Sequence, residues 1–195
     1  MNIKITTDST CDLSAEQLKR HNIELFPLCI SMGDKCLRDG LEITPDDIYA
    51  HVDAGGDICT TSALNIADYS DRFSVLSKEY DAVIHLNISA EFSSCYQNAV
   101  LAAQEFDNVY VVDSRNLSTG HGHVVLRAAE LAESGMDAQE IVNTLNVFTG
   151  KVDASFILSR LDYMKKGGRC SSIVALGANL LHLRPCIEVV GGKMQ

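Results

Sequence analysis

The stretch Ala82-Val83-Ile84-His85-Leu86-Asn87-Ile88, continued by Ser89-Ala90-Glu91-Phe92-Ser93-Ser94, decides the fold of this 195-residue chain. Its first part is an apolar run with the length of a buried strand. Apolar residues then recur at helical spacing over residues 96–106. Three serines separate the two parts, and Ser93 or Ser94 falls where a helix N-cap is expected. The stretch therefore predicts a strand, a hydroxyl-rich loop and a helix.

Such a loop has two interpretations. The N-terminus of a helix offers unpaired amide groups and a partial positive charge, so together with the serine hydroxyls it can bind an anion. The alternative is that Ser93 only caps its helix. The loop alone does not separate the two.

Up to about residue 150 the chain alternates predicted strands with predicted helices. Strands are expected over residues 2–7, 23–30, 35–38, 82–88 and 109–112, and helices over 14–21, 45–54, 66–77, 96–106, 118–134 and 137–148. Gly33-Asp34-Lys35 predicts a hairpin turn between the second and third strands. This alternation is typical of a doubly wound α/β fold with a parallel or mixed sheet.

Clustered hydroxyl side chains recur at the predicted ends of strands or starts of helices. The four segments are Asp8-Ser9-Thr10, Thr60-Thr61-Ser62, residues 89–94 and Asp113-Ser114. The carboxyl ends of parallel strands meet at one edge of a sheet, where ligands bind in open α/β folds. We therefore expect these segments to converge on one ligand site.

The pattern changes near residue 153. Strands over residues 154–158 and 185–190, short helices over 160–166 and 173–181, and a turn at 191–193 predict the start of an α+β domain. We expect an amino-terminal α/β domain over residues 1–152 and an incomplete carboxyl-terminal domain over 153–195. The densest positive cluster, Lys165-Lys166-Gly167-Gly168-Arg169, is either a solvated turn or a contact for an anionic ligand or acidic partner.

Composition narrows the function classes. The formal charge of −10 argues against nucleic acid and acidic membranes as partners, and no apolar run approaches a membrane span. Seven scattered cysteines without a C-x-x-C pair favour free thiols in a reducing compartment, so we expect a cytoplasmic protein without a secretion signal. The P-loop, G-x-G-x-x-G and G-x-S-x-G motifs are absent from the sequence. His121-Gly122-His123 is weak evidence for a metal, and His85 has the setting of a core histidine.

A set of short motifs follows in order along the chain. They are Thr7-Asp8-Ser9-Thr10, Arg38-Asp39-Gly40, Thr61-Ser62, Ile88-Ser89 through Ser93 to Tyr96-Gln97 and Ala99, Val112-Asp113-Ser114, Gly167-Gly168-Arg169 and Arg184-Pro185. The combination resembles the DegV family of bacterial fatty-acid-binding proteins over essentially the whole chain. The resemblance implies an α/β domain followed by an α+β domain, with a long-chain fatty acid bound between them and no other cofactor.

The resemblance also implies which residues bind the ligand. Thr61, Ser62 and Ser93, with Ser94 beside them, match the hydroxyl positions that hold the fatty acid carboxylate, while Gly168 and Arg169 match a glycine–arginine turn. The family's common S-G-T-Y reads Ser93-Ser94-Cys95-Tyr96 here, T-S-Q-P-S reads residues 61–65, and Arg184 replaces the usual lysine before proline. A fatty acid kinase partner that makes an acyl phosphate is implied in the same way.

The leading hypothesis is a non-enzymatic carrier of fatty acids. Its rival is an acyl-transfer or hydrolytic enzyme with Ser93 as the nucleophile and His85 or His121 as the base. A sugar or phosphate sensor would need more cationic residues near the predicted site than the sequence places there.

Overall fold

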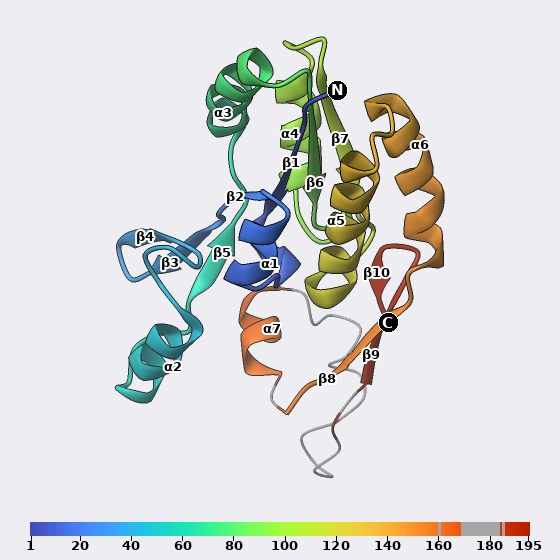
Figure 1. Cartoon of the computed structure of the whole chain (residues 1–195). Coiled ribbons are helices and arrows are strands. Elements are labelled where there is room, and N and C mark those ends of the chain that lie inside the picture. The colour runs from blue at the N-terminus through green and yellow to red at the C-terminus, as the bar shows by residue number, and fades with distance from the viewer. Residues whose placement is uncertain (160, 169–183, 185) are drawn as a thin grey trace.

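The computed structural model describes residues 1–159, 161–168, 184 and 186–195. A four-stranded parallel sheet lies at its centre, in the order β2-β1-β6-β7 (Figure 1). Its strands are β1 (Ile3–Asp8), β2 (Glu24–Phe26), β6 (Ala82–Asn87) and β7 (Val109–Asp113). The register pairs Thr7 with Leu86 and Asn87 with Asp113, so the loops after β1, β6 and β7 leave the sheet at one edge. The predicted α/β fold with a mainly parallel sheet is confirmed.

Helices cover both faces of this sheet. One face packs against α1 (Ala15–Arg20), α5 (Ser118–Glu133) and α6 (Ala138–Phe148), and the other against α3 (Ile66–Glu79) and α4 (Cys95–Ala103). Ile84 and Leu86 of β6 belong to the first core, while Val83 belongs to the second. Because both faces of β6 are buried, the strand reads as a continuous apolar run rather than an alternating one.

A small antiparallel sheet corrects two of the sequence predictions. It has the order β4-β3-β5 and consists of β3 (Cys29–Met32), β4 (Lys35–Arg38) and β5 (Thr60–Ser62), with α2 (Pro45–Asp53) nearby in the chain. The strand predicted over 23–30 is therefore two strands in two sheets, divided at Pro27, which has no amide hydrogen for a ladder. Thr60–Ser62 is itself a strand and not a loop of the parallel sheet.

Cysteine pairing is a further correction. The structure records a disulfide between Cys29 and Cys36 across the β3–β4 hairpin, where free thiols were expected. Cys11, Cys59, Cys95 and Cys186 are the free cysteines of the described part of the chain.

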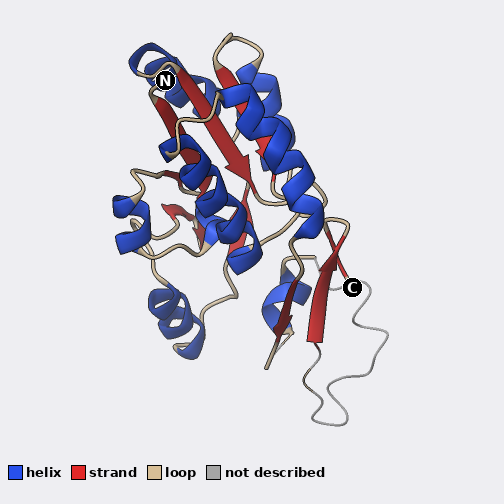
Figure 2. Cartoon of the chain, turned by 45° about the vertical axis from the view of Figure 1, so that its right-hand side comes forward, coloured by secondary structure: helices blue, strands red, loops and turns tan. Residues whose placement is uncertain are grey.

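The carboxyl-terminal segment forms another antiparallel sheet, β10-β9-β8 (Figure 2). Its elements are β8 (Ala154–Ile157), α7 (Asp162–Lys166), β9 (Cys186–Val190) and β10 (Lys193–Met194), and 3-10 turns occur at Ser9–Cys11 and Thr149–Lys151. The helix predicted over 173–181 lies outside the described residues, and the boundary at residue 152 stays a prediction. No helix in the described ranges has the length and apolar character to cross a membrane.

The turn between β9 and β10 reaches back to the loop after β6. The Ser89 hydroxyl donates to the Gly192 carbonyl at 2.7 Å, and the Arg115 guanidinium donates to the Gly191 carbonyl at 3.1 Å. Gly192 has a φ of +86°, and a Cβ there would lie 2.8 Å from the Ser89 hydroxyl. A side chain is therefore disfavoured at this position on two counts. These contacts bring the carboxyl-terminal sheet to the loop that carries Ser93.

Candidate functional site

A cavity of about 380 Å³ lies where the three sheets meet. The parallel sheet contributes loop residues after β1, β6 and β7, the small antiparallel sheet contributes β5, and the carboxyl-terminal segment contributes β8, α7 and β10. The lining residues are Thr10, Leu28, Asp39, Thr61, Ser62, Ala63, Ile88, Phe92, Ser93, Leu117, Phe156, Leu158, Tyr163, Met164, Gly167 and Met194. The volume falls within the range of small-molecule sites in proteins, about 300–1,000 Å³.

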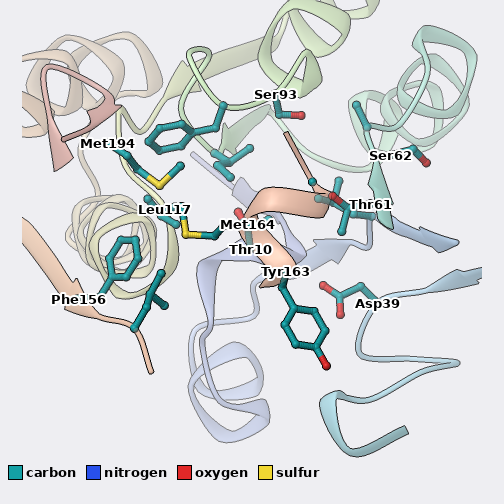
Figure 3. A pocket seen from close by; sticks show the side chains of 16 residues that line it. Thr10, Asp39, Thr61, Ser62, Ser93, Leu117, Phe156, Tyr163, Met164 and Met194 are labelled. Carbon is teal, nitrogen blue, oxygen red and sulfur yellow. The ribbon is translucent and has the colours of Figure 1, made fainter. Parts of the chain in front are cut away.

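The cavity has two chemically different sides. Figure 3 shows Ser93, Thr61, Ser62 and Asp39 on one side of the view, and Met194, Leu117 and Phe156 on the other. Such a lining suits an amphipathic ligand with a small polar group and an extended apolar part.

The polar side depends on the start of α4. Ser94 is the N-cap residue, but its side chain makes no capping hydrogen bond within the described part of the chain. The Ser93 hydroxyl instead accepts from the Cys95 amide at 3.3 Å and donates to the Cys95 sulfur at 3.1 Å. By contrast, α3 begins with a reciprocal capping box between Asn65 and Asp68. The start of α4 is therefore less completely capped by side chains, and it carries a pocket-lining hydroxyl.

A buried polar network lies directly behind the cavity. The Asp8 carboxylate accepts from the Ile88 amide at 2.8 Å, from the Thr10 hydroxyl at 2.6 Å, from the Thr10 amide at 3.1 Å and from the Asn87 side-chain amide at 3.3 Å. Asp8 and Asn87 are fully buried. Thr10 both lines the cavity and reaches this network, so the network fixes one wall of the site.

Both buried histidines belong to this network. His85 Nδ1 lies 2.8 Å from the Thr6 hydroxyl, and its Nε2 lies 3.1 Å from the Asn87 side-chain nitrogen. Burial lowers the pKa of His85 to about 3 and, in the same direction, lowers the pKa of His121. The prediction of His85 as a core histidine is confirmed.

His121 is also hydrogen-bonded away from Ser93. Its Nε2 lies 3.1 Å from the Thr7 hydroxyl and its Nδ1 lies 3.2 Å from the Thr10 hydroxyl. Among the described residues, neither His85 nor His121 hydrogen-bonds to Ser93. No described group of three or more His, Cys, Asp or Glu side chains has an arrangement that could hold a metal ion.

The cavity brings most of the predicted ligand-binding residues together. Thr61, Ser62 and Ser93 all line it, whereas Ser94 is exposed and is not among the lining side chains. Gly168, with a φ of +75°, is exposed beside the lining residue Gly167, and Arg169 lies outside the described residues. Asp113 and Ser114 are not among the lining residues, and the buried Ser114 hydroxyl donates to the Asn116 carbonyl.

Asp39 is a lining residue that sequence reasoning did not identify as part of the site. In the sequence it belongs to the Arg38-Asp39-Gly40 motif of the family resemblance, to which no role in the site was assigned. In the structure its carboxylate accepts from the Ser9 hydroxyl at 2.7 Å at the edge of the cavity. The apolar residues Leu117, Phe156 and Met194 were likewise not predicted to line the site. They lie in separate segments of the chain, and the sequence does not show that the fold brings these segments together.

Comparison with known proteins gives a consistent result. A family model described as an uncharacterised protein of the DegV family matches residues 2–195. A DegV domain-containing protein from Clostridium perfringens is 32% identical over 194 residues, covering 98% of this chain and 70% of that protein.

Solved structures agree in fold. One described as showing fatty acid binding of a DegV family protein from Thermus thermophilus has a TM-score of 0.91 and 34% identity, covering 100% of this chain and 70% of the other. A stearic acid-binding protein from Eubacterium ventriosum has a TM-score of 0.88 and 28% identity, covering 98% and 68%. Because the family model matches almost the whole length of this chain, the chain belongs to the DegV family.

Proposed function

We propose that this protein binds a long-chain fatty acid in the cavity, with its carboxylate on the side of Thr61, Ser62 and Ser93. The observation that carries the proposal is the division of the cavity into a hydroxyl side and an apolar side. The fatty acid binding described for the relatives from Thermus thermophilus and Eubacterium ventriosum supports the same class of ligand.

The two sides of the cavity have separate tasks in this proposal. Hydroxyl groups donate hydrogen bonds to the carboxylate, and bonds of this kind to a charged group contribute about 1.5–3 kcal/mol each. Phe156, Met164 and Met194 contact the acyl chain, where each buried methylene contributes about 0.8 kcal/mol. Ser94 contributes through its backbone at the start of α4, because its side chain does not line the cavity.

We further propose that the bound fatty acid is presented to a separate fatty acid kinase, which converts it to an acyl phosphate. In this proposal the protein is a cytoplasmic carrier and not itself an enzyme. The turn around Gly168 and Arg169 then faces the ligand or the kinase. Gly167 lines the cavity and the neighbouring Lys165 and Lys166 are exposed, which supports a role for this turn near the cavity opening.

Calorimetric titration with palmitate tests the binding proposal, with hexadecanol as the matched ligand that lacks a carboxylate. We expect one palmitate to bind per chain, and hexadecanol to bind more weakly by at least about tenfold, since one charged hydrogen bond is lost. Absence of saturable palmitate binding would refute the proposal, and equal affinities would refute the placement of the carboxylate.

Incubation with an activated acyl ester separates a carrier from the enzyme with a Ser93 nucleophile. We expect neither turnover nor a covalent adduct on Ser93. Either product would overturn the carrier proposal, and would do so independently of the titration. The kinase step is tested by acyl phosphate formation with ATP and a fatty acid kinase, where Arg169→Ala should lower the rate.

A further inference from the structure

Cys95 occupies a fully buried position directly beneath the pocket-lining Ser93. It is the first residue of α4, and its sulfur accepts the hydrogen bond that Ser93 donates at 3.1 Å. Tyr69 also lies close to this side chain, since each of the two groups shifts the pKa of the other. The thiol therefore lies below the cavity, hydrogen-bonded to the Ser93 hydroxyl and near the buried Tyr69 side chain.

The Tyr69 side chain near this sulfur is itself fixed by its neighbours. The Tyr69 ring is fully buried, with its centroid 5.8 Å from that of Phe73 and 6.0 Å from that of Phe26. Its hydroxyl accepts from the Asn87 side-chain amide at 3.1 Å, and Asn87 in turn donates to Asp8. Asn87 thus joins the buried Asp8 carboxylate to Tyr69, and Tyr69 lies beside Cys95, which is hydrogen-bonded to Ser93.

A thiol has the hydrogen-bonding properties that Ser93 needs in two states. Burial raises the pKa of Cys95, which keeps the thiol protonated at neutral pH. A protonated thiol is a weak acceptor and a weak donor. It can accept the Ser93 proton when the cavity is empty, and it can donate to the Ser93 oxygen when that proton turns to a carboxylate. Hydrogen bonds in such a chain polarise one another, so the second arrangement strengthens the donation by Ser93.

We propose that Cys95 is a positioning residue that orients the Ser93 hydroxyl toward the carboxylate of the ligand. This inference rests on the proposed function, since it concerns the same cavity. It assigns a task to a buried side chain that never touches the ligand.

A double-mutant cycle on palmitate affinity tests the proposal. Cys95→Ala should weaken palmitate binding about 2- to 13-fold, the range of one neutral hydrogen bond, while Cys95→Ser should stay within about twofold of the wild type. In a Ser93→Ala background the same Cys95→Ala change should alter the affinity by less than about twofold, because the side chain that Cys95 orients is gone.

If Cys95→Ala lowered palmitate affinity equally in the wild type and in the Ser93→Ala variant, the proposal would be overturned. Cys95 would then act only through packing. A loss with Cys95→Ser as large as that with Cys95→Ala would also overturn it. The melting temperature of each variant is measured on the same sample. The ranking of the variants by melting temperature should differ from their ranking by palmitate affinity.

The S–H stretching band of Cys95 gives a test that needs no ligand. The infrared band is assigned as the one missing from the Cys95→Ala spectrum, and it should move in Ser93→Ala because the sulfur loses a donor. An unmoved band would refute the Ser93–Cys95 contact and the proposal with it. If the band moves in Ser93→Ala but the wild type binds no palmitate, the proposed function is refuted. The contact by which Cys95 orients the Ser93 hydroxyl would still be supported.

Discussion

Two polar clusters lie at the same end of the central sheet, and they differ in what surrounds them. The sealed cluster consists of Thr6, Asp8, His85, Asn87 and His121, all of which are fully buried and hydrogen-bonded. The open cluster consists of Thr61, Ser62 and Ser93, which line the cavity. The comparison indicates that polar residues of the same types stabilise the fold where they are buried and are available to a ligand where they line the cavity. Changes in the sealed cluster should lower stability, and changes in the open cluster should lower affinity.

The largest expected effect is on stability, for Asp8→Ala. The change leaves the partly buried Thr10 and Ile88 amides without their acceptor, and an unpaired donor of this kind costs up to about 1–3 kcal/mol. The free energy of unfolding in urea should therefore fall by about 2–6 kcal/mol. Asp113→Ala is the matched control, since that carboxylate accepts two amide hydrogen bonds that are exposed to water. Equal losses in the two variants would contradict the distinction between sealed and exposed carboxylates.

Acid should also destabilise the fold through the sealed cluster. Unfolded His85 takes up a proton near its ordinary pKa of 6.5, whereas the folded residue resists protonation down to about pH 3. Between these values the unfolded state binds more protons, so stability falls as the pH falls, by about 1.4 kcal/mol per pH unit from this residue.

Urea unfolding of wild type and His85→Gln at pH 6 and pH 4 measures this contribution. The wild type should lose about 2.7 kcal/mol more than the variant across the two pH units. His121 should add to the acid sensitivity of both proteins, because its pKa is lowered in the same direction. Identical losses would mean that His85 is protonated without unfolding.

The open cluster should respond in affinity. Ser93→Ala should weaken palmitate binding roughly 10- to 150-fold, the effect of one hydrogen bond to a charged group. Ser94→Ala is the matched control, because its side chain is exposed and makes no capping bond with any described residue. If the two serines had equal effects on affinity, the special place of Ser93 in the cavity would be refuted.

The smallest effect concerns the two helix starts. Asn65→Ala removes the cap of α3 and should lower the free energy of unfolding by about 0.5–2 kcal/mol, with no change in palmitate affinity. Ser94→Ala at the start of α4 should cost much less, since no capping bond is lost. A reversed order of the two melting temperatures would contradict the capping assignment.

The sequence predicted some parts of the fold and of the two clusters but not others. The β6–loop–α4 unit was predictable because a buried strand and an amphipathic helix each leave a periodic signal. The convergence of the loops after β1 and β6 followed from the geometry of parallel sheets. The pairing of Thr7 with His121 was not predictable, because 114 residues separate them and packing alone joins them.

The small antiparallel sheet was the harder part of the fold. β5 has three residues, too few for a period of two to stand out, and a second short strand, β2, is separated from β3 only by Pro27 and Leu28. Only the structure identified Asp39 as a residue of the cavity, since its sequence motif does not show which way the carboxylate points. Short strands and turn residues took their positions from long-range contacts that one sequence does not display.

Native mass spectrometry of the purified protein tests the central claim most directly, namely that Ser93 and Thr61 hold the carboxylate of a fatty acid. The wild type should carry an added mass equal to one long-chain fatty acid. The Ser93→Ala, Thr61→Val double variant should appear without it, while its melting temperature stays close to that of the wild type freed of fatty acid. A wild type without any bound fatty acid after incubation with palmitate, or a double variant that retains it fully, would contradict the account.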